Sequence, residues 1–329
     1  MSKAKEKPYV GIDLGGTNIF AAVIAPNGDI LGEAKKRTKA ALGADLVTAR
    51  IARVVEQALK KAGLKKKKVG GIGIGIPGPI DPDTGIVHRC VNLGKSWDEY
   101  PLVANLQDMI GMPVTIDNDV NVGAVGEYAY GAGRGSEHML ALFVGTGLGG
   151  GLILNGKLFS GTRYSAAEAG HMVILADGPM CGCGEVGHAE ALASRTAMER
   201  FIREDIRAGK PTIIPTLMGD KIDGIMTSGI IGRAYDAGDE VTMNAVAKAQ
   251  YYLGLLISSC VNLLDPEVIV VGGGVVERMG EEYLDPVRPI AQQHYVNKSD
   301  MDKVRIVAAT LGDYSGAMGA AVLAKQRLG

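Results

Sequence analysis

Residues 9–33 read "YVGIDLGGTNIFAAVIAPNGDILGE", and this stretch carries the clearest structural signal in the chain. An apolar run that starts at Tyr9 meets a turn of small residues at 15–18, and a second apolar run follows. The dipeptide Asn27-Gly28 then favours a tight hairpin turn into a third strand. The sequence therefore predicts three consecutive strands, with a glycine-rich turn between the first two.

The same order returns in the middle of the chain. Residues 139–161, "MLALFVGTGLGGGLILNGKLFSG", again place an apolar strand before a Gly/Thr turn, a second strand and an Asn-Gly turn. Two unrelated hairpins would account for each stretch separately. The shared order favours an internal duplication, with two similar domains that face each other.

Apolar periodicity predicts the remaining elements. Strands are expected within 69–80, 113–117 and 267–275, and helices over 45–62, 102–110, 187–205, 240–264 and 316–328. The stretch 206–230 is expected to be irregular. Strands that alternate with helices in this way indicate an α/β fold.

Composition excludes several classes of protein. The chain has 329 residues and a formal net charge of −1, so no global basic field attracts it to nucleic acid or to an anionic membrane. Four cysteines suit a reducing compartment better than a disulfide framework. No uninterrupted apolar run is long enough to span a bilayer, and the N-terminus lacks the apolar segment of a signal peptide. We therefore expect a cytoplasmic protein.

Three glycine-rich turns are candidates for binding phosphate through unobstructed backbone N–H groups. A carboxylate at the end of the first strand suits Mg²⁺, directly or through water. Each turn by itself is an ordinary loop, but three in one α/β chain favour a nucleotide. Neither a P-loop nor a G-x-G-x-x-G in a first βαβ unit is present. The candidate residues are Asp13, Gly15, Gly16, Thr17 and Asn18 in the first turn, Thr146 and Gly147 in the second, and Gly272, Gly273 and Gly274 in the third.

Seven short motifs stand in order along the chain: D-L-G-G-T-N at 13–18, G-I-P-G-P at 75–79, D-N-D-V-N at 117–121, G-T-G-L-G-G-G at 145–151, E-A-G-H at 168–171, C-G-C-G-E-V-G-H-A-E at 181–190 and V-G-G-G-V at 271–275. Together these motifs resemble the ROK family, which comprises bacterial sugar kinases and some transcriptional repressors. The resemblance runs from Tyr9 to near the C-terminus, and the glucokinases are the most similar members.

The resemblance implies a two-lobed α/β fold of the actin/hexokinase-like (ribonuclease H-like) ATPase type, with a cleft between the lobes. We expect one lobe to contain residues 1–120 and 312–329. The other, 121–311, would carry the cysteine-rich loop. The family also implies a homodimer or a dimer of dimers, to which the apolar part of a helix around 243–264 could contribute. A helix buried within one subunit would explain that segment equally well.

The function implied is ATP-dependent phosphorylation of a hexose at its 6-hydroxyl, with Mg²⁺ and with glucose as the first candidate. N-acetylmannosamine, N-acetylglucosamine, fructose, mannose and allose stay open as substrates, and ADP or polyphosphate stays open as phosphate donor. A sugar-responsive repressor is disfavoured, because the eight residues before Tyr9 hold no DNA-binding domain. A sugar-binding protein that has lost catalysis is disfavoured by Asp13, Asp119 and the phosphate turns.

The resemblance also assigns site residues. Asp119 is similar to the family's catalytic base, which accepts the proton of the sugar hydroxyl. Taken alone, Asn-Asp after a strand is as consistent with a plain turn. The expected sugar ligands are Gly78 in the G-I-P-G-P turn, Asn118, Asp119, Glu168, His171 and Glu190.

The stretch "CGCGEVGHAE" at 181–190 contributes to a candidate zinc site. His171, Cys181, Cys183 and His188 offer two nitrogen and two sulfur ligands, an ordinary set for structural zinc. In the family the last ligand is usually a cysteine, so His188 leaves two possibilities: zinc retained with an imidazole ligand, or an emptied site with reduced thiols. We expect zinc to be retained. It would hold the loop that ends at Glu190 and leave one nitrogen of His171 for the sugar.

Overall fold

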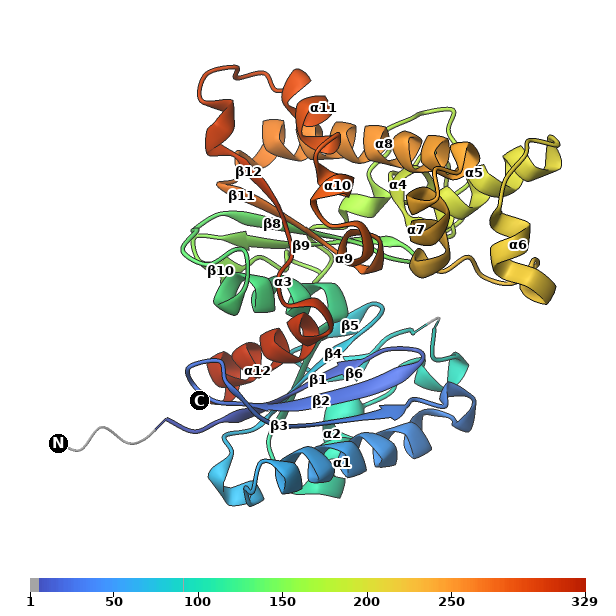
Figure 1. Ribbon diagram of the computed structural model, residues 1–329. Helices are drawn as coiled ribbons and strands as arrows, with labels where there is room; N and C mark the ends of the chain where they lie inside the picture. Colours follow the sequence, from blue (N-terminus) through green and yellow to red (C-terminus); the bar gives the residue numbers. More distant parts are fainter. Residues whose placement is uncertain (1–5, 91) are drawn as a thin grey trace.

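The computed structural model describes residues 6–90 and 92–329 and has two lobes, each built around a five-stranded sheet (Figure 1). The strands of the first sheet are β1 (Tyr9–Leu14), β2 (Asn18–Ile24), β3 (Ile30–Arg37), β4 (Ile72–Ile76) and β7 (Val114–Asn118), in the order β3-β2-β1-β4-β7. Those of the second are β8 (Met139–Val144), β9 (Leu148–Leu154), β10 (Lys157–Leu158), β11 (Val268–Gly272) and β12 (Arg305–Ala308), in the order β10-β9-β8-β11-β12. A short hairpin of β5 (Ile80–Asp81) and β6 (Ile86–Val87) follows β4.

The two sheets share one topology. In the first, β1 pairs antiparallel with β2 and parallel with β4; in the second, β8 pairs antiparallel with β9 and parallel with β11. The second turn of the predicted repeat is a tight one, since Asn155 and Gly156 have φ values of 51° and 70°. The prediction of two similar domains from two similar stretches of sequence is confirmed at the level of the sheets.

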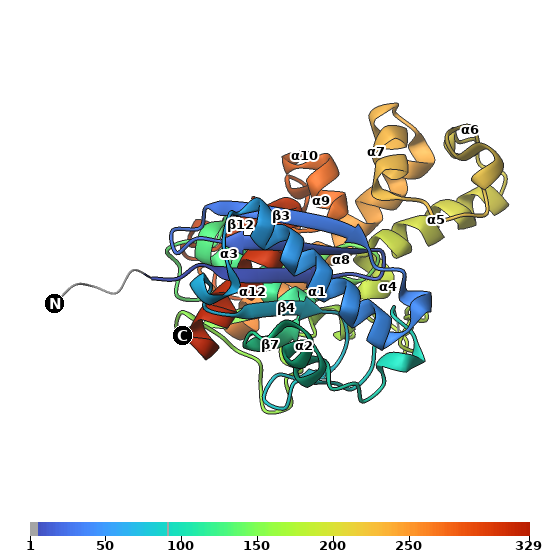
Figure 2. The same cartoon turned by 90° about the horizontal axis from the view of Figure 1, so that it is seen from below.

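Helices cover the outer face of each sheet. In the first lobe these are α1 (Ala44–Lys61) and α2 (Leu102–Ile110), on the side from which Figure 2 is viewed. Leu102 and Leu106 of α2 and the apolar stripe of α1 are fully buried in the core of this lobe. The second lobe carries α4 (Glu190–Ala193), α5 (Arg195–Arg207), α6 (Ile214–Met218), α7 (Ser228–Asp236), α8 (Glu240–Leu264), α9 (Gly274–Met279), α10 (Glu281–Leu284) and α11 (Val287–Gln293).

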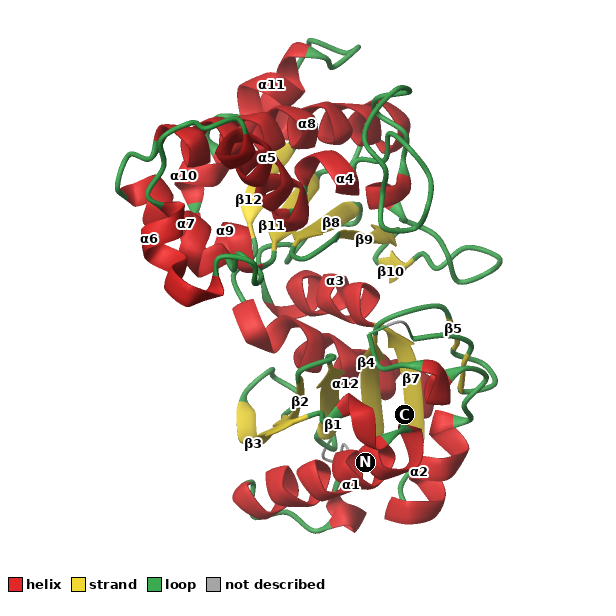
Figure 3. Ribbon diagram, turned by 90° about the vertical axis from the view of Figure 1, so that its right-hand side faces the viewer, coloured by secondary structure: helices red, strands yellow, loops and turns green. Residues whose placement is uncertain are grey.

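Two helices, α3 (Asp119–Tyr130) and α12 (Ser315–Leu328), lie between the sheets (Figure 3). A cluster of buried residues from both helices packs against β8, β9 and β11, and other α12 residues pack against β1 and β2. The helices cross very closely: a Cβ on Gly319 would lie 1.7 Å from the carbonyl oxygen of Val122, and one on Gly126 would lie 2.2 Å from that of Ser315. Small residues on both helices therefore allow this close packing.

The chain passes between the lobes at α3 and again in the segment 309–314, and Glu127 joins these two crossings. Its buried carboxylate accepts hydrogen bonds from the backbone N–H groups of Thr310 (3.1 Å) and Leu311 (2.8 Å) in that segment. It also accepts one from Ala132 (2.9 Å), just after α3. Because unpaired buried backbone groups are costly, this carboxylate stabilises both crossings in one arrangement.

Three parts of the chain differ from the predictions. The predicted helix over 187–205 is wrong as one element, because it breaks at Ser194, whose side chain caps α5 by accepting a hydrogen bond from Ala197 N–H. The stretch 206–230 is not wholly irregular, since it contains α6 and the start of α7. Helix α3 was not predicted at all.

Among the described residues, no helix combines the length and apolar character that crossing a bilayer requires.

The C-terminal helix also pairs with a buried carboxylate of the first sheet. Arg327 of α12 contacts Asp117 of β7, with 2.5 Å between guanidinium nitrogen and carboxylate oxygen, and donates to the carbonyl of Ile116 (2.8 Å). The other oxygen of Asp117, a residue only 2% exposed, accepts hydrogen bonds from Asn118 N–H and from Asn121 Nδ2, both at 2.8 Å. This network holds the junction between β7 and α3.

We expect Arg327→Met to lower the free energy of unfolding by about 3 kcal/mol, because it leaves a buried carboxylate without its cation. Urea denaturation at pH 7 measures the change. Lys325→Met is the matched control on the same helix: Lys325 pairs with Glu6 at the surface, where an ion pair contributes at most about 1 kcal/mol. Equal losses in the two variants would contradict this assignment.

Candidate functional site

The parallel strands of the first sheet bring three sequence motifs to one edge. Asp13 of β1 is the register partner of Gly75 in β4, and Gly75 is the partner of Asp117 in β7. The turn at 15–18, the G-I-P-G-P turn and the start of α3 therefore follow at the same carboxyl edge, where ligands of open α/β sheets bind. Gly75 leaves room here, since a Cβ on it would meet Val122 at 2.3 Å and the Cα of Asp119 at 3.4 Å.

The second sheet does the same for the other two glycine-rich turns. Phe143, near the end of β8, is the register partner of Gly272 at the end of β11, so the turns at 145–147 and 272–274 leave the sheet side by side. Gly273 has a φ of 90°, and a Cβ on it would lie 2.6 Å from the carbonyl oxygen of Val144. Only glycine fits this close approach between the two turns.

The first glycine-rich turn lines a pocket of about 260 Å³. Backbone and side-chain hydrogen bonds shape the turn: Gly15 N–H donates to the Asn18 carbonyl (2.9 Å), and the Thr38 hydroxyl donates to the Gly15 carbonyl (2.6 Å). All five residues predicted there, Asp13, Gly15, Gly16, Thr17 and Asn18, line this pocket. So do Phe20, Lys35 and Asp313, which the sequence did not indicate.

Asp119 is the first residue of α3, directly after β7. Asn118 caps the helix, as its Oδ1 accepts hydrogen bonds from the backbone N–H groups of Val120 (2.9 Å) and Asn121 (3.3 Å). Its Nδ2 donates to the carbonyl of Gly78 at 3.4 Å. The predicted sugar ligands Asn118 and Gly78 therefore contact each other beside Asp119, and half of the Asn118 amide is already used by the helix.

Two carboxylates of the site have raised pKa values. Burial raises the pKa of Asp119 to about 6, and the negative charge of Glu168 adds to the effect. Burial also raises the pKa of Asp13 to about 6, together with the charges of Asp119 and Asp313 and against that of Lys35. Perturbed carboxylates gathered in one place are characteristic of functional sites.

Glu190, the first residue of α4, connects the second glycine-rich turn with the cysteine-rich loop. One carboxylate oxygen accepts a hydrogen bond from Leu148 N–H (3.0 Å), and the other accepts one from the Cys181 thiol (3.3 Å). A Cβ on Gly147 would lie 2.2 Å from the first of these oxygens. A side chain at position 147 would therefore collide with Glu190. The sequence indicated only a phosphate contact for this turn and did not predict that Glu190 lies against it.

The structure brings all four predicted zinc ligands together. The nearest nitrogen and sulfur atoms of His171, Cys181, Cys183 and His188 all lie within 4.8 Å of one another. Nδ1 of His171 is 3.3 Å from Nδ1 of His188 and 3.9 Å from Sγ of Cys181, while Sγ of Cys183 is 3.2 Å from Nδ1 of His188. A tetrahedral zinc ion separates two nitrogen ligands by about 3.3 Å and nitrogen from sulfur by about 3.6 Å. The four residues therefore fit zinc.

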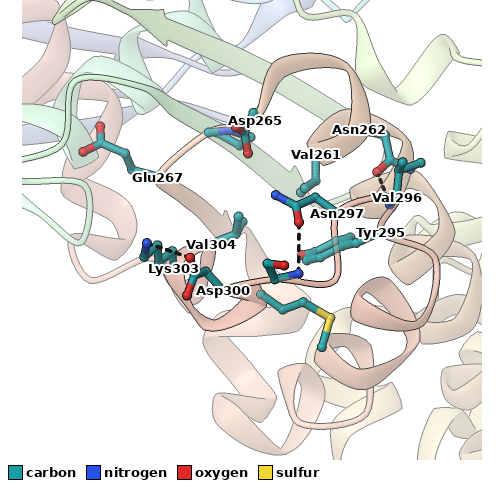
Figure 4. A pocket seen from close by; sticks show the side chains of 13 residues that line it. Val261, Asn262, Asp265, Glu267, Tyr295, Val296, Asn297, Asp300, Lys303 and Val304 are labelled. Carbon is teal, nitrogen blue, oxygen red and sulfur yellow. Dashed lines mark hydrogen bonds and ion pairs between the residues drawn. The ribbon is translucent and has the colours of Figure 1, made fainter.

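A second pocket, of about 530 Å³, lies elsewhere, around the C-terminal end of α8 and the loop before β12 (Figure 4). Much of its polar lining is engaged within the protein: Lys303 pairs with Asp300 (2.8 Å), and Asn262 Oδ1 accepts from Val296 N–H (2.9 Å). Glu267 accepts from His138 N–H (2.8 Å). None of the predicted site residues lines this pocket. The candidate site therefore lies at the carboxyl edges of the parallel strands, where the glycine-rich turns of the two sheets begin.

Comparison with known proteins agrees with this geometry. The family model described as "ROK family" matches residues 9–327. The glucokinase of Halalkalibacterium halodurans is 36% identical over 321 residues, which cover 97% of this chain and 95% of that protein. The glucokinase of Thermotoga maritima is 33% identical over 325 residues, covering 97% and 98%. A ROK glucokinase from Streptomyces griseus, solved with glucose and AMPPNP, superimposes with a TM-score of 0.82 at 33% identity over 97% of this chain and 99% of that one. A model match over nearly the whole length, on a two-lobed fold shared with a solved member, shows that the chain belongs to the ROK family.

Proposed function

We propose that this protein is an ATP-dependent hexose kinase that phosphorylates glucose at its 6-hydroxyl. The observation that carries the proposal is the position of Asp119, a partly buried carboxylate with a pKa raised to about 6. It lies close enough to Asp13, in the pocket of the first glycine-rich turn, for its charge to raise the pKa of Asp13. The Streptomyces griseus relative, with glucose and AMPPNP bound, supports both substrates.

In this mechanism Asp119 accepts the proton of the 6-hydroxyl as that oxygen attacks the terminal phosphate. Phosphoryl transfer has a loose transition state, so the remaining task of the chain is to position the groups and neutralise charge. The backbone N–H groups of the turn at 15–18 would hold phosphate oxygens. The carboxylate of Asp13 suits Mg²⁺, which when bound neutralises charge on the phosphates.

We further propose that Asn118, Glu168, His171, Glu190 and the G-I-P-G-P turn bind the sugar. Glu168 and His171 are exposed, as residues that contact a ligand must be, and Asn118 already contacts Gly78 of that turn. The proposed zinc ion would be structural. It would take Nδ1 of His171 and leave Nε2 directed away from the cluster, available to a sugar hydroxyl.

A coupled assay for ADP release with a panel of sugars tests the function. We expect glucose to give the highest kcat/KM among glucose, N-acetylmannosamine, N-acetylglucosamine, fructose, mannose and allose, with ATP as the donor. Polyphosphate and ADP are tested as donors in parallel. A different preferred sugar would keep the kinase and change its substrate, whereas no ADP release with any of them would overturn the proposal.

Gly147→Ala is expected to raise the KM for the sugar about tenfold or more. The added methyl group would lie 2.2 Å from the Glu190 carboxylate and displace it. Initial-rate kinetics with varied glucose measures this effect. Gly229→Ala is the control, since a Cβ there meets its nearest neighbour at an ordinary 3.7 Å. If only the KM for ATP rose, the substitution would have disturbed phosphate binding by the turn and not the position of Glu190.

The proposed lobe boundaries, 1–120 plus 312–329 and 121–311, follow the two crossings at α3 and at 309–314. The four cysteines, all within the described residues, form no disulfide with one another, which supports the proposal that the protein works in the cytoplasm.

We also propose a homodimer or dimer of dimers. Exposed apolar residues lie near Asn262 of α8: Val173 lines a hollow with it, and Val296 N–H donates to its Oδ1. They are 60% and 85% exposed, and Leu263, the next residue of α8, is 75% exposed. Patches of this kind mark interfaces. Val296→Glu is therefore expected to weaken self-association at least tenfold in sedimentation velocity. Ile225→Glu, at a residue 70% exposed elsewhere, should leave it unchanged. A monomeric wild-type protein would contradict the proposal.

A further inference from the structure

Lys35 lies in the phosphate pocket although no motif in the sequence points to it. Asp13 of β1 is the register partner of Phe20 in β2, and Phe20 is the partner of Lys35 in β3. Because register partners share a face of the sheet, the three side chains form a row that leads from the first glycine-rich turn to the edge strand. Phe20 packs edge-to-face on Tyr314, the residue before α12, with 5.4 Å between ring centroids.

The charges of this pocket are unbalanced for a polyanionic ligand. Among the residues that line it, Asp13 and Asp313 are acidic and Lys35 is the one basic residue. Asp119 adds a further carboxylate close enough to raise the pKa of Asp13. A nucleotide would bring several negative charges of its own to these carboxylates. Lys35 is the cation that this lining offers to the phosphates.

The present partner of Lys35 is easily exchanged. Its Nζ lies 3.1 Å from Oδ2 of Asp313, and the two side chains are 50% and 76% exposed. An exposed ion pair of this kind contributes little free energy, because water screens it and both side chains lose mobility. A phosphate chain carries more charge than one carboxylate and forms stronger, charge-assisted hydrogen bonds with an ammonium group. Phosphate would therefore displace Asp313 from Lys35.

We propose that Lys35 is a further catalytic residue, which leaves Asp313 and binds the phosphates of the nucleotide so as to neutralise charge during phosphoryl transfer. This inference rests on the proposed kinase function. It assigns the charge neutralisation that such transfer needs to a side chain outside the glycine-rich turns. Bond making is unchanged: the proton of the sugar hydroxyl still goes to Asp119, and the leaving group is ADP.

The test compares Lys35→Met, Lys35→Arg and Lys36→Met. Lys36→Met is the matched control, because it removes the same charge from the same strand. The register partner of Lys36 is Ile19, so its side chain lies on the opposite face of the sheet. Calorimetric titration with AMPPNP and Mg²⁺ measures nucleotide affinity, and steady-state kinetics measures kcat/KM for ATP and for glucose. We expect Lys35→Met to lower kcat/KM for ATP 10- to 100-fold and AMPPNP affinity at least fivefold, with glucose affinity unchanged. Lys35→Arg should recover most of both losses, and Lys36→Met should change neither by more than twofold.

Asp313→Ala distinguishes the phosphate role from a structural one. If Lys35 exchanges partners, Asp313→Ala binds AMPPNP at least as tightly as the wild type. If the ion pair only stabilises the pocket, Asp313→Ala loses AMPPNP affinity as Lys35→Met does, and the inference is overturned. AMPPNP affinity and turnover within twofold of wild type in Lys35→Met would overturn it as well. A wild-type protein that binds AMPPNP but releases no ADP with any sugar would instead refute the kinase function, and the titrations would still decide whether Lys35 binds phosphate.

Discussion

Replacing Asp119 by Asn is expected to lower kcat by a factor of about 10² to 10⁴, the usual contribution of a general base. The amide has the same shape, and its oxygen can still accept the hydrogen bond that Asp119 Oδ1 takes from Val120 N–H at 3.0 Å. It cannot accept the proton of the sugar hydroxyl. Glucose affinity, measured by calorimetry, should stay within a few-fold of wild type.

The stability of the folded protein provides a control for Asp119→Asn. The pKa of Asp119 in the folded protein, about 6, lies above the value of about 4 expected for an unfolded aspartate. The folded state therefore binds more protons in this interval, and wild-type stability falls as the pH rises from about 4 to 6. Asp119→Asn should accordingly be at least as stable as wild type at pH 7.5. A variant that is stable and retains more than a tenth of wild-type turnover would show that Asp119 is not the base.

The pH profile gives an independent reading of the same assignment. Asp119 must be ionised to accept a proton, and Asp13 must be ionised to hold Mg²⁺, and each has a pKa of about 6. We expect log kcat/KM to fall below pH 6 with a limiting slope approaching about two. The exposed carboxylate of Asp108 on α2 serves as control, since Asp108→Asn should leave the profile unchanged. A profile that is flat down to pH 5 would contradict the assignment.

Loss of the proposed zinc ion should have the second large effect. We expect about one zinc per chain in the purified protein, and a loss of activity on chelation even with Mg²⁺ in excess. Without the metal the loop that leads to Glu190 loses its anchor and His171 its orientation. Disturbing the partners that orient site groups typically costs a factor of about 10 to 100. Metal analysis and kinetics on the same preparations measure the two effects separately.

Variants of His188 make the zinc prediction specific. His188→Cys should keep both metal and activity, because thiolate and imidazole are both competent zinc ligands. His188→Ala should lower both. Cys260→Ala removes a buried thiol in α8 outside the cluster, so its zinc content should equal that of wild type. An active preparation free of zinc would refute the prediction and leave the four residues as a loop of thiols and imidazoles.

The parts of the fold that the sequence predicts correctly are those with local signals. The turn at Asn155-Gly156 needs left-handed backbone at both positions, as its Asn-Gly dipeptide predicts. At Asn27-Gly28 only Gly28 has a positive φ, of 94°, and β2 and β3 are joined by a loop over 25–29 that is longer than the tight turn expected there. Helix α8 was predicted as a continuous element, and α2 ends at Gly111 with a φ of 66°, as expected for a helix-terminating glycine. Family membership followed in the same way, from motifs that are contiguous in the chain.

Helix α3 was missed because its environment hides its signal. It lies between two sheets and against α12, so that seven consecutive residues, 121–127, are buried. A helix covered on nearly every side has no polar stripe, and its sequence lacks the periodicity that reveals a surface helix. The break at Ser194 was missed for another reason: the residue reads as one more polar position in a helix until its side chain is seen to cap α5.

For the site, the sequence by itself determined which residue types are present: carboxylates after strands, glycines in turns, and two histidines with two cysteines near one another along the chain. Only the tertiary structure decided which of them meet. Lys35 and Asp313 are 278 positions apart and form an ion pair, because strand register places one beside Asp13 and the packing of α12 brings the other over it. Glu190 likewise joins the proposed zinc ligands to Leu148, directly after the turn at 145–147 and 42 positions away in the chain. Contacts of this kind depend on how sheets and helices pack, and no local propensity along the chain encodes them.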